Sequence, residues 1–197
     1  MPLLIFSPRF AMLFLLMITV AMLRIPTAYI PVLSNFTPVG AIALFGGHYF
    51  NNKLKAGLFP LIPLLMSDLI INNLIYDGKY GVMHGGWYWI YASFFCIAMI
   101  GKYALKKITV TNIILAAILS TIFYWLIVDG MVWIGGGNDI RTMLPLSRDV
   151  AGLVQSYWQG LPFMKNFLTG TLLYSAILFG IFEWMKHRIP VLKTSTI

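Results

Sequence analysis

Charge is scarce in this chain of 197 residues, and acids are scarcer than bases. Only 10% of the residues are charged, 14 of them Lys or Arg and 6 Asp or Glu, whereas 59% are hydrophobic and the mean hydropathy is +0.83. A soluble domain carries about 25% charged residues, so this chain has too few to cover a surface that faces water. The composition excludes a soluble globular protein and predicts a polytopic membrane protein with a single domain, residues 1–197.

Cysteine and catalytic motifs are also rare or missing. Cys96 is the single cysteine and lies in an apolar run, so no disulfide framework can form within one chain. The chain contains no GxSxG, HExxH, Walker or CxxC motif. We therefore expect no enzyme activity, no catalytic residues, no cofactor and no resident metal. Any active transport would need another subunit to supply the energy.

Six apolar segments are long enough, or nearly so, to cross a bilayer, which takes ~20 residues. They are residues 9–24, 34–50, 56–75, 87–105, 111–134 and 163–185. The first resembles a signal peptide in length, but no clear small-residue cleavage site follows it. Glycines at 135–137 should end the fifth helix, and the polar connection after them contains a candidate interfacial helix near residues 149–158. The predicted fold is all-α, with six transmembrane helices.

The charges indicate an orientation for these spans. With both termini cytoplasmic, nine of the 14 basic residues fall on the inner side and five on the outer side, while only one acid is inside. The inner set is Arg9, Lys53, Lys55, Lys102, Lys106, Lys107, Lys186, Arg188 and Lys193. This bias follows the positive-inside rule. Because the basic residues flank apolar segments, we attribute the net charge of +8 to the orientation of the spans in the membrane. No nucleic-acid partner is therefore expected.

Polar side chains within the third span are the strongest sign of a site. Asp68 lies about two turns from its outer end, where a carboxylate is costly unless it pairs or lines a hydrated cavity. Asn72 and Asn73 follow at i+4 and i+5, which predicts a polar stripe that opens outward. Two interpretations remain open: Asp68 lines a binding pocket, or it pairs with Arg24, Asn35 or a broken helix end.

Four more residues are candidate substrate contacts near the outer side. Asp129 lies near the outer end of the fifth span, where it either lines the pocket or simply reaches the wet interface. His84, in an outer loop, is either a ligand or a solvated side chain. Trp87 and Tyr88 begin the fourth span, where an aromatic belt at the membrane surface is the simpler interpretation and a pocket wall the alternative.

Three stretches carry a resemblance to known proteins: residues 35–50 (NFTPVGAIALFGGHYF), 60–73 (PLIPLLMSDLIINN) and 162–180 (PFMKNFLTGTLLYSAILFG). They resemble an uncharacterised family of small six-span bacterial membrane proteins. That family is in turn similar to the S components of energy-coupling factor (ECF) transporters, which capture vitamins. The resemblance implies six helices in the bacterial cytoplasmic membrane, cytoplasmic termini, a pocket beneath the outer loops and an energising ECF module as partner.

The solitary cobalamin transporters look most similar within that group. An outer-half cysteine binds cobalt in them, whereas here the corresponding region holds Asn72, Asn73, Tyr76 and Asp77. If the substrate is a corrinoid, the resemblance makes His84 the substitute cobalt ligand. The first span also lacks the Ala-x-x-x-Ala pattern that S components often use to dock the energising subunit.

The sequence therefore favours a substrate-binding transporter component for a vitamin-class micronutrient, with cobalamin as one candidate ligand. Two alternatives stay open. A structural or assembly subunit of a membrane complex would explain the missing catalytic motifs and the small residues Ala43 and Gly47, which allow close helix contact. A membrane enzyme acting on lipid-linked substrates would need at least two converging acid or base groups at the outer interface.

Overall fold

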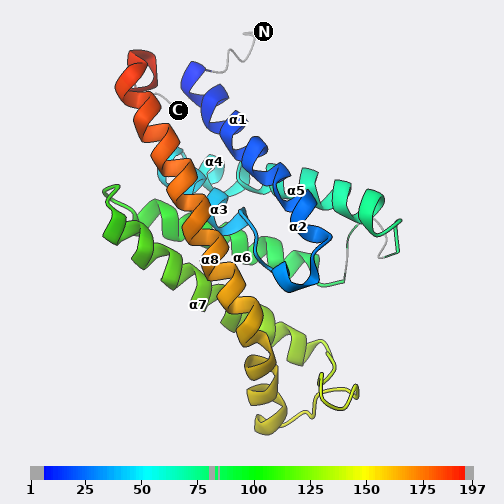
Figure 1. The fold of residues 1–197 in the computed structure, drawn as a ribbon. Helices are drawn as coiled ribbons and strands as arrows, with labels where there is room; N and C mark the ends of the chain where they lie inside the picture. The colour runs from blue at the N-terminus through cyan, green and yellow to red at the C-terminus, as the bar shows by residue number, and fades with distance from the viewer. Residues whose placement is uncertain (1–6, 80–82, 84, 194–197) are drawn as a thin grey trace.

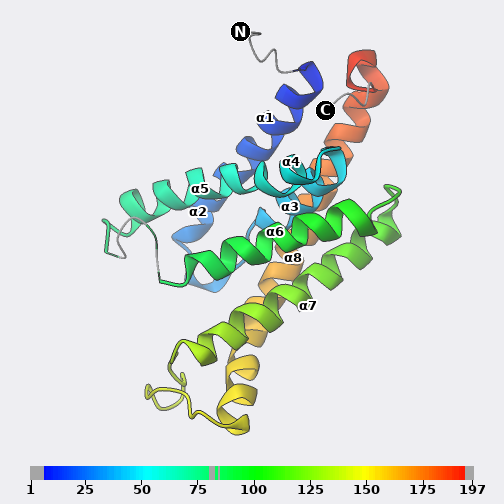
Figure 2. The same ribbon diagram turned by 180° about the vertical axis from the view of Figure 1, so that it is seen from behind.

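Helices form nearly all of the regular structure in the computed structural model, which describes residues 7–79, 83 and 85–193 (Figures 1 and 2). The α-helices are α1 (Pro8–Met22), α2 (Arg24–Ala28), α3 (Val39–Tyr49), α4 (Lys53–Leu58), α5 (Leu61–Ile70), α6 (Trp87–Ala104), α7 (Val110–Ile134) and α8 (Val150–Arg188). Short 3₁₀ turns cover Pro31–Leu33 and Pro190–Lys193, and a π-helical turn, η2 (Ile71–Ile75), extends α5. No β-strand occurs in this part of the chain, so the all-α prediction is confirmed.

Several helices begin where a polar side chain satisfies the first free backbone N–H groups. The Ser7 hydroxyl accepts a hydrogen bond from the Phe10 amide at the start of α1, and Thr109 does the same at the start of α7. Asn52 caps α4, and Asp149 caps α8 by accepting from the Gly152 amide at 2.8 Å. These are the residue types with the strongest N-cap preference, so the sequence itself specifies these four boundaries.

Four helical segments are long and apolar enough to cross a membrane. They are residues 8–28, 53–75, 110–134 and 150–188. The predicted second span, residues 34–50, is helical only over Val39–Tyr49, and 11 residues reach only about 16 Å. α6 reproduces the predicted fourth span in position, but its Trp and Tyr rings and Lys102 lower its hydropathy. The length and composition of the helices thus support a membrane protein with four clear candidate spans.

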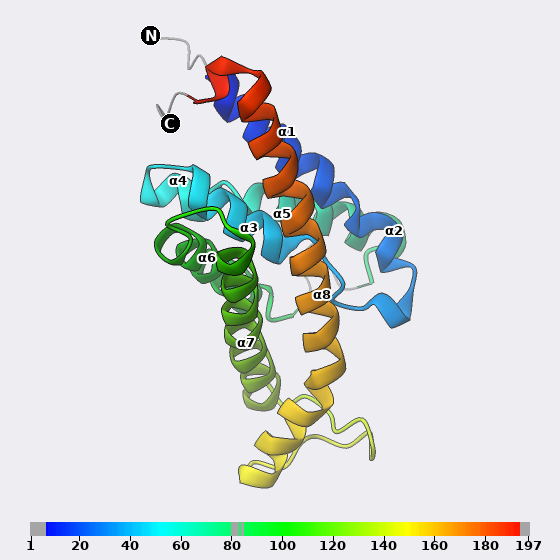
Figure 3. The same ribbon diagram turned by 60° about the vertical axis from the view of Figure 1, so that its left-hand side comes forward.

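The last helix differs most from the sequence-based expectation. We predicted a span over residues 163–185 preceded by a separate interfacial helix, but α8 is one continuous helix of 39 residues with Pro162 inside it. At 1.5 Å per residue it is about 58 Å long. It packs antiparallel to α7, and this α7–α8 hairpin extends well beyond the other helices (Figure 3). The glycines at 135–137 do end α7, as predicted.

α3 is the central helix and is buried along almost its whole length. It packs against α6 and α8 most extensively and also contacts α1, α4 and α7. Small residues permit its approach to α6: a Cβ at Gly47 would overlap the Ala98 carbonyl oxygen, and one at Gly101 would overlap the Leu44 carbonyl. The close helix contact predicted at Gly47 therefore lies inside the protein, between α3 and α6.

Candidate functional site

The Asp68 carboxylate is the most buried charge among the predicted site residues, with 6% of the residue exposed. Arg24 from α2 pairs with it, with 2.6 Å between Nη1 and Oδ1, and Nη1 also donates to Ser67 Oγ at 2.6 Å. The Tyr91 hydroxyl from α6 donates to the other oxygen, Oδ2, at 2.8 Å. Both carboxylate oxygens thus have a partner, which is how a charge is accommodated inside a membrane protein.

The same ion pair lines a cavity of about 290 Å³ between the helices, so Asp68 both pairs with Arg24 and faces open space. The cavity is lined by parts of α2, the 30–39 connection, α5, η2, α6 and α7. Its polar lining comes from Arg24, Thr27, Ser34, Asn35, Thr37, Asp68, Asn72, Tyr76 and Tyr124, and its apolar lining includes Leu64, Ile71, Ile90 and Phe94. A cavity with several converging polar groups on apolar walls has the composition of a small-molecule site.

The predicted polar stripe is present for two of its three members. Asp68 and Asn72 line the same cavity, and Asn72 is only 4% exposed. Asn73 is exposed and its Nδ2 donates back to the Leu69 carbonyl at 2.7 Å. Asn72 and Asn73 are adjacent in the π-helical turn η2, and adjacent residues of a helix do not face the same way. The geometry of the helix thus separates Asn73 from the other two.

Asp129 lines a second cavity of about 280 Å³, beside the first. The two cavities share Ser34, Asn35 and Tyr124 as lining residues. α8 approaches Asp129 closely because residue 160 is glycine: a Cβ at Gly160 would overlap the carboxylate. The structure therefore places Asp68 and Asp129 in adjoining cavities, with Tyr124 on both linings.

The remaining predicted contacts are not part of these two cavities. Trp87 and Tyr88 are 40% and 54% exposed, and Tyr88 lines a separate hollow beside Trp89. Trp87 packs edge-to-face on the Tyr91 ring, with centroids 5.5 Å apart, and so supports the residue that holds Asp68. His84 lies outside the described residues. Among the residues that are described, no three His, Cys, Asp or Glu side chains group as metal ligands, and Cys96 is exposed.

Two cavity residues were absent from the predicted substrate contacts. Arg24 was expected only as one of three pairing partners for Asp68, and Tyr124 was not singled out, because it lies within the mostly apolar fifth span and was taken as part of that span. The signal for Arg24 was its position: it ends the first apolar segment on the predicted outer side, and Asp68 lies in the outer half of the third. The signal for Tyr124 appears only once α7 is packed against α6 and α8.

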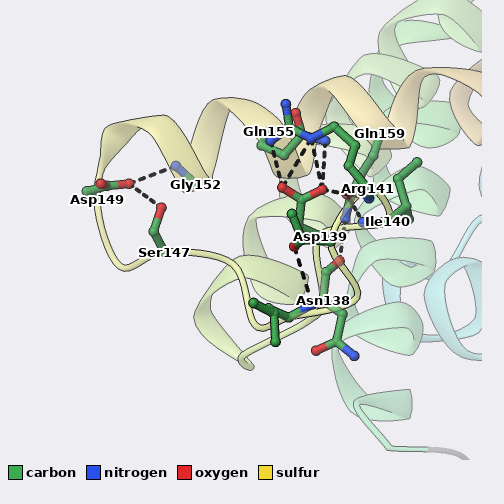
Figure 4. Close-up of polar contacts among 11 residues, drawn as sticks. Asn138, Asp139, Ile140, Arg141, Ser147, Asp149, Gly152, Gln155 and Gln159 are labelled. Atoms are coloured by element: carbon green, nitrogen blue, oxygen red, sulfur yellow. Dashed lines mark hydrogen bonds and ion pairs between the residues drawn. The ribbon is translucent and has the colours of Figure 1, made fainter.

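The connection between α7 and α8 is ordered by polar contacts and covers the edge of the second cavity (Figure 4). Arg141 donates from Nε and Nη2 to the Asp139 carboxylate, the shorter distance being 2.6 Å. Gln159 binds the loop backbone twice, accepting from the Ile140 amide and donating to the Asn138 carbonyl. Ile140 and Gln159 both line the second cavity, so the loop forms part of its wall.

The Asp139–Arg141 ion pair in this loop should make the stability of the folded protein depend on pH. Hydrogen bonds from the Arg141 side chain lower the pKa of Asp139 below its ordinary value. A carboxyl with a lowered pKa in the folded state stabilises that state above about pH 4, and the contribution is lost as the pH falls through the lowered pKa. In an NMR titration of the Asp carboxyl carbons, Asp139 should titrate below pH 4 in the wild type and at a higher pH in Arg141→Gln. Equal midpoints in both proteins would contradict the ion pair.

The fold and site define a helical membrane-type protein with a polar cavity between its helices. Residues 5–192 match a family described as a family of unknown function, DUF6580, and the chain belongs to this family. No curated protein and no solved structure matches the chain.

Proposed function

We propose that this protein is the substrate-binding component of a transporter that takes up a small vitamin-class micronutrient, resembling the S components of ECF transporters. The observation that carries the proposal is the buried Arg24–Asp68 pair facing a cavity between helix ends. Charged residues within membrane segments are costly and mark substrate pathways when they face a cavity. An ion pair that served only to stabilise the fold would be expected to pack against other side chains and not to face a cavity.

The proposed topology has six passes through the bacterial cytoplasmic membrane, with both termini in the cytoplasm. Two observations support it. The basic residues cluster on one side of the predicted spans. The start of α1 also lies beside the last described residues of the chain (Figure 1): the Arg9 guanidinium donates to the Leu192 and Lys193 carbonyls, which is the arrangement expected for an even number of passes. The cavity then lies toward the extracytoplasmic side, and an energising module is the proposed partner.

The cavity volume bears on the choice of substrate. At about 290 Å³ it is at the lower end of the range for small-molecule sites, roughly 300–1,000 Å³. A corrinoid is far larger, so cobalamin could enter only if the two adjoining cavities merged and the outer segments moved apart. A compact vitamin-sized molecule fits the present shape better.

The structure offers less support for the two alternatives. The small residues that would suit a scaffold, Ala43 and Gly47, are buried inside the protein, and Gly47 already makes the close contact between α3 and α6. An enzyme would need at least two converging acid or base groups, whereas both oxygens of Asp68 have partners and Asp129 lines a different cavity. A scaffold does not explain the polar cavity.

The test is whether the protein retains a small molecule. We would purify it from bacterial cells in mild detergent and record native mass spectra, together with a visible absorption spectrum for any corrinoid. We expect one retained species, lost or weakened at least tenfold in Asn72→Ala, because Asn72 lines the cavity. Asn73→Ala is the matched control, since Asn73 is exposed and faces elsewhere. A protein that carries no molecule, and binds none from a vitamin mixture, would contradict the proposal.

A further inference from the structure

Arg24 has more hydrogen-bond donors than the protein uses. Its guanidinium carries five N–H groups, and the bonds to Ser67 and Asp68 both come from Nη1. Among the residues that the structure describes, no partner is recorded for Nε or Nη2 of Arg24. The side chain is one-fifth exposed and lines the cavity. The Nε–Nη2 edge of a guanidinium is one of the forks that bind a carboxylate through two parallel hydrogen bonds.

Asp68 is the reverse case. Oδ1 binds Arg24 and Oδ2 binds the Tyr91 hydroxyl, and the side chain is only 8% exposed. Each carboxylate oxygen could accept a further hydrogen bond, but so little of the Asp68 side chain is exposed that a cationic ligand has little access to it, whereas an anionic ligand finds the Nε–Nη2 edge of Arg24 free of partners among the described residues. The charge of the ligand group is also limited. Because Asp68 already offsets Arg24, a group with one negative charge suits the site better than a doubly charged phosphate.

Tyr124, from α7, supplies a second polar group on the cavity lining. The residue is nine-tenths buried and lines both cavities. No hydrogen bond of its hydroxyl is recorded within the described residues, although buried Tyr hydroxyls usually have a partner. Its ring is held in place by stacking on Phe167, with centroids 4.5 Å apart, and by contact with Phe94 at 5.1 Å. The hydroxyl is thus fixed in position and available to a ligand.

We propose that the cavity binds a small organic monocarboxylate, with the carboxylate on the Nε–Nη2 edge of Arg24 and a polar group in the body of the molecule on the Tyr124 hydroxyl. The apolar walls at Leu64, Ile90 and Phe94 would contact the part between these two ends. This inference rests on the proposed function and narrows its substrate class to carboxylate-bearing micronutrients.

The experiment uses a small-molecule extract of bacterial cells, divided in two. One half is left untreated, and the other is coupled to methylamine with a carbodiimide, which converts carboxylates to amides. The purified protein is incubated with each half and examined by native mass spectrometry. A molecule retained from the untreated half and not from the amidated half supports the inference. The same molecule retained from both halves, or one without a carboxylate, overturns the inference and leaves the transport proposal standing. No retained molecule from either half overturns both.

Two conservative variants test the residues. Arg24→Lys keeps the positive charge beside Asp68 but lacks the planar fork, so we expect affinity for the retained carboxylate to fall at least tenfold while the melting temperature changes little. Tyr124→Phe should also weaken binding several-fold. Its control is Tyr174→Phe, since Tyr174 is buried but lines neither cavity. Wild-type affinity in Arg24→Lys would overturn the assignment of the carboxylate to Arg24.

Discussion

Asp68→Asn is expected to lower the free energy of unfolding by about 3 kcal/mol. The substitution keeps the shape of the side chain but leaves the Arg24 guanidinium without its counter-charge. Removing one partner of a buried ion pair costs roughly 3–5 kcal/mol, and the lower end applies because one-fifth of the Arg24 side chain is exposed. Denaturant or thermal unfolding of the protein in detergent would measure the change.

The matched control for this variant is Asp77→Asn. Asp77 is exposed and has a left-handed backbone, with φ of 49°, which Asn also adopts readily. The same chemical change there should alter stability by less than about 0.5 kcal/mol. A second check replaces both members of the buried pair, as Arg24→Met with Asp68→Leu, which should restore most of the lost stability. If Asp68→Asn is no more costly than Asp77→Asn, the ion pair does not contribute as the geometry indicates.

Gly47→Ala should be the most harmful of the single-methyl changes in the helices. A Cβ at this position would overlap the backbone carbonyl of Ala98, and backbone cannot move aside as a flexible side chain can. We expect a loss of about 1–3 kcal/mol, the usual cost of overpacking a close contact. The change would be measured by unfolding in detergent, beside a Gly→Ala variant at an open position.

Gly180→Ala provides that comparison. Gly180 lies within α8, and nothing approaches the position that a Cβ would occupy within 4 Å. Alanine is favoured over glycine in a helix by roughly 0.5–1 kcal/mol, so this variant should be as stable as the wild type or more so. A similar loss in both variants would mean that helix propensity, and not the contact between α3 and α6, determines the effect at Gly47.

The parts of the site that sequence could predict depend on local spacing. Asp68 and Asn72 are four residues apart on one helix, and the structure places both on one cavity. The partner of Asp68 was left open among Arg24, Asn35 and a broken helix end, because Arg24 is 44 residues away and no local pattern links the two. Tyr124 was missed for the same reason. Its role arises from the packing of α7 against α6 and α8.

The fold shows a similar division. The apolar runs of the sequence indicated which parts of the helices can contact lipid. A helix, however, can begin or end outside the apolar run that it contains. Polar residues such as Gln155 and Gln159 lie outside the predicted sixth span, yet α8 includes them, because helix formation requires backbone hydrogen bonds and not an apolar surface. Conversely, residues 34–38 were included in the second span although they are not helical: Asn35 has a φ of 64°, and α3 begins only after Pro38.

The length of α8 has a mechanical consequence. One helix of about 58 Å reaches from the loop that borders the second cavity to the end where the two termini meet. Such a helix acts as a lever: a pivot of ~10° about its midpoint would move each end by about 5 Å, in opposite directions. Pro162 removes one backbone hydrogen bond near the cavity end and is the position where the lever can bend. While α8 stays straight at Pro162, movement of the cavity wall and movement of the described chain ends are coupled through this one helix.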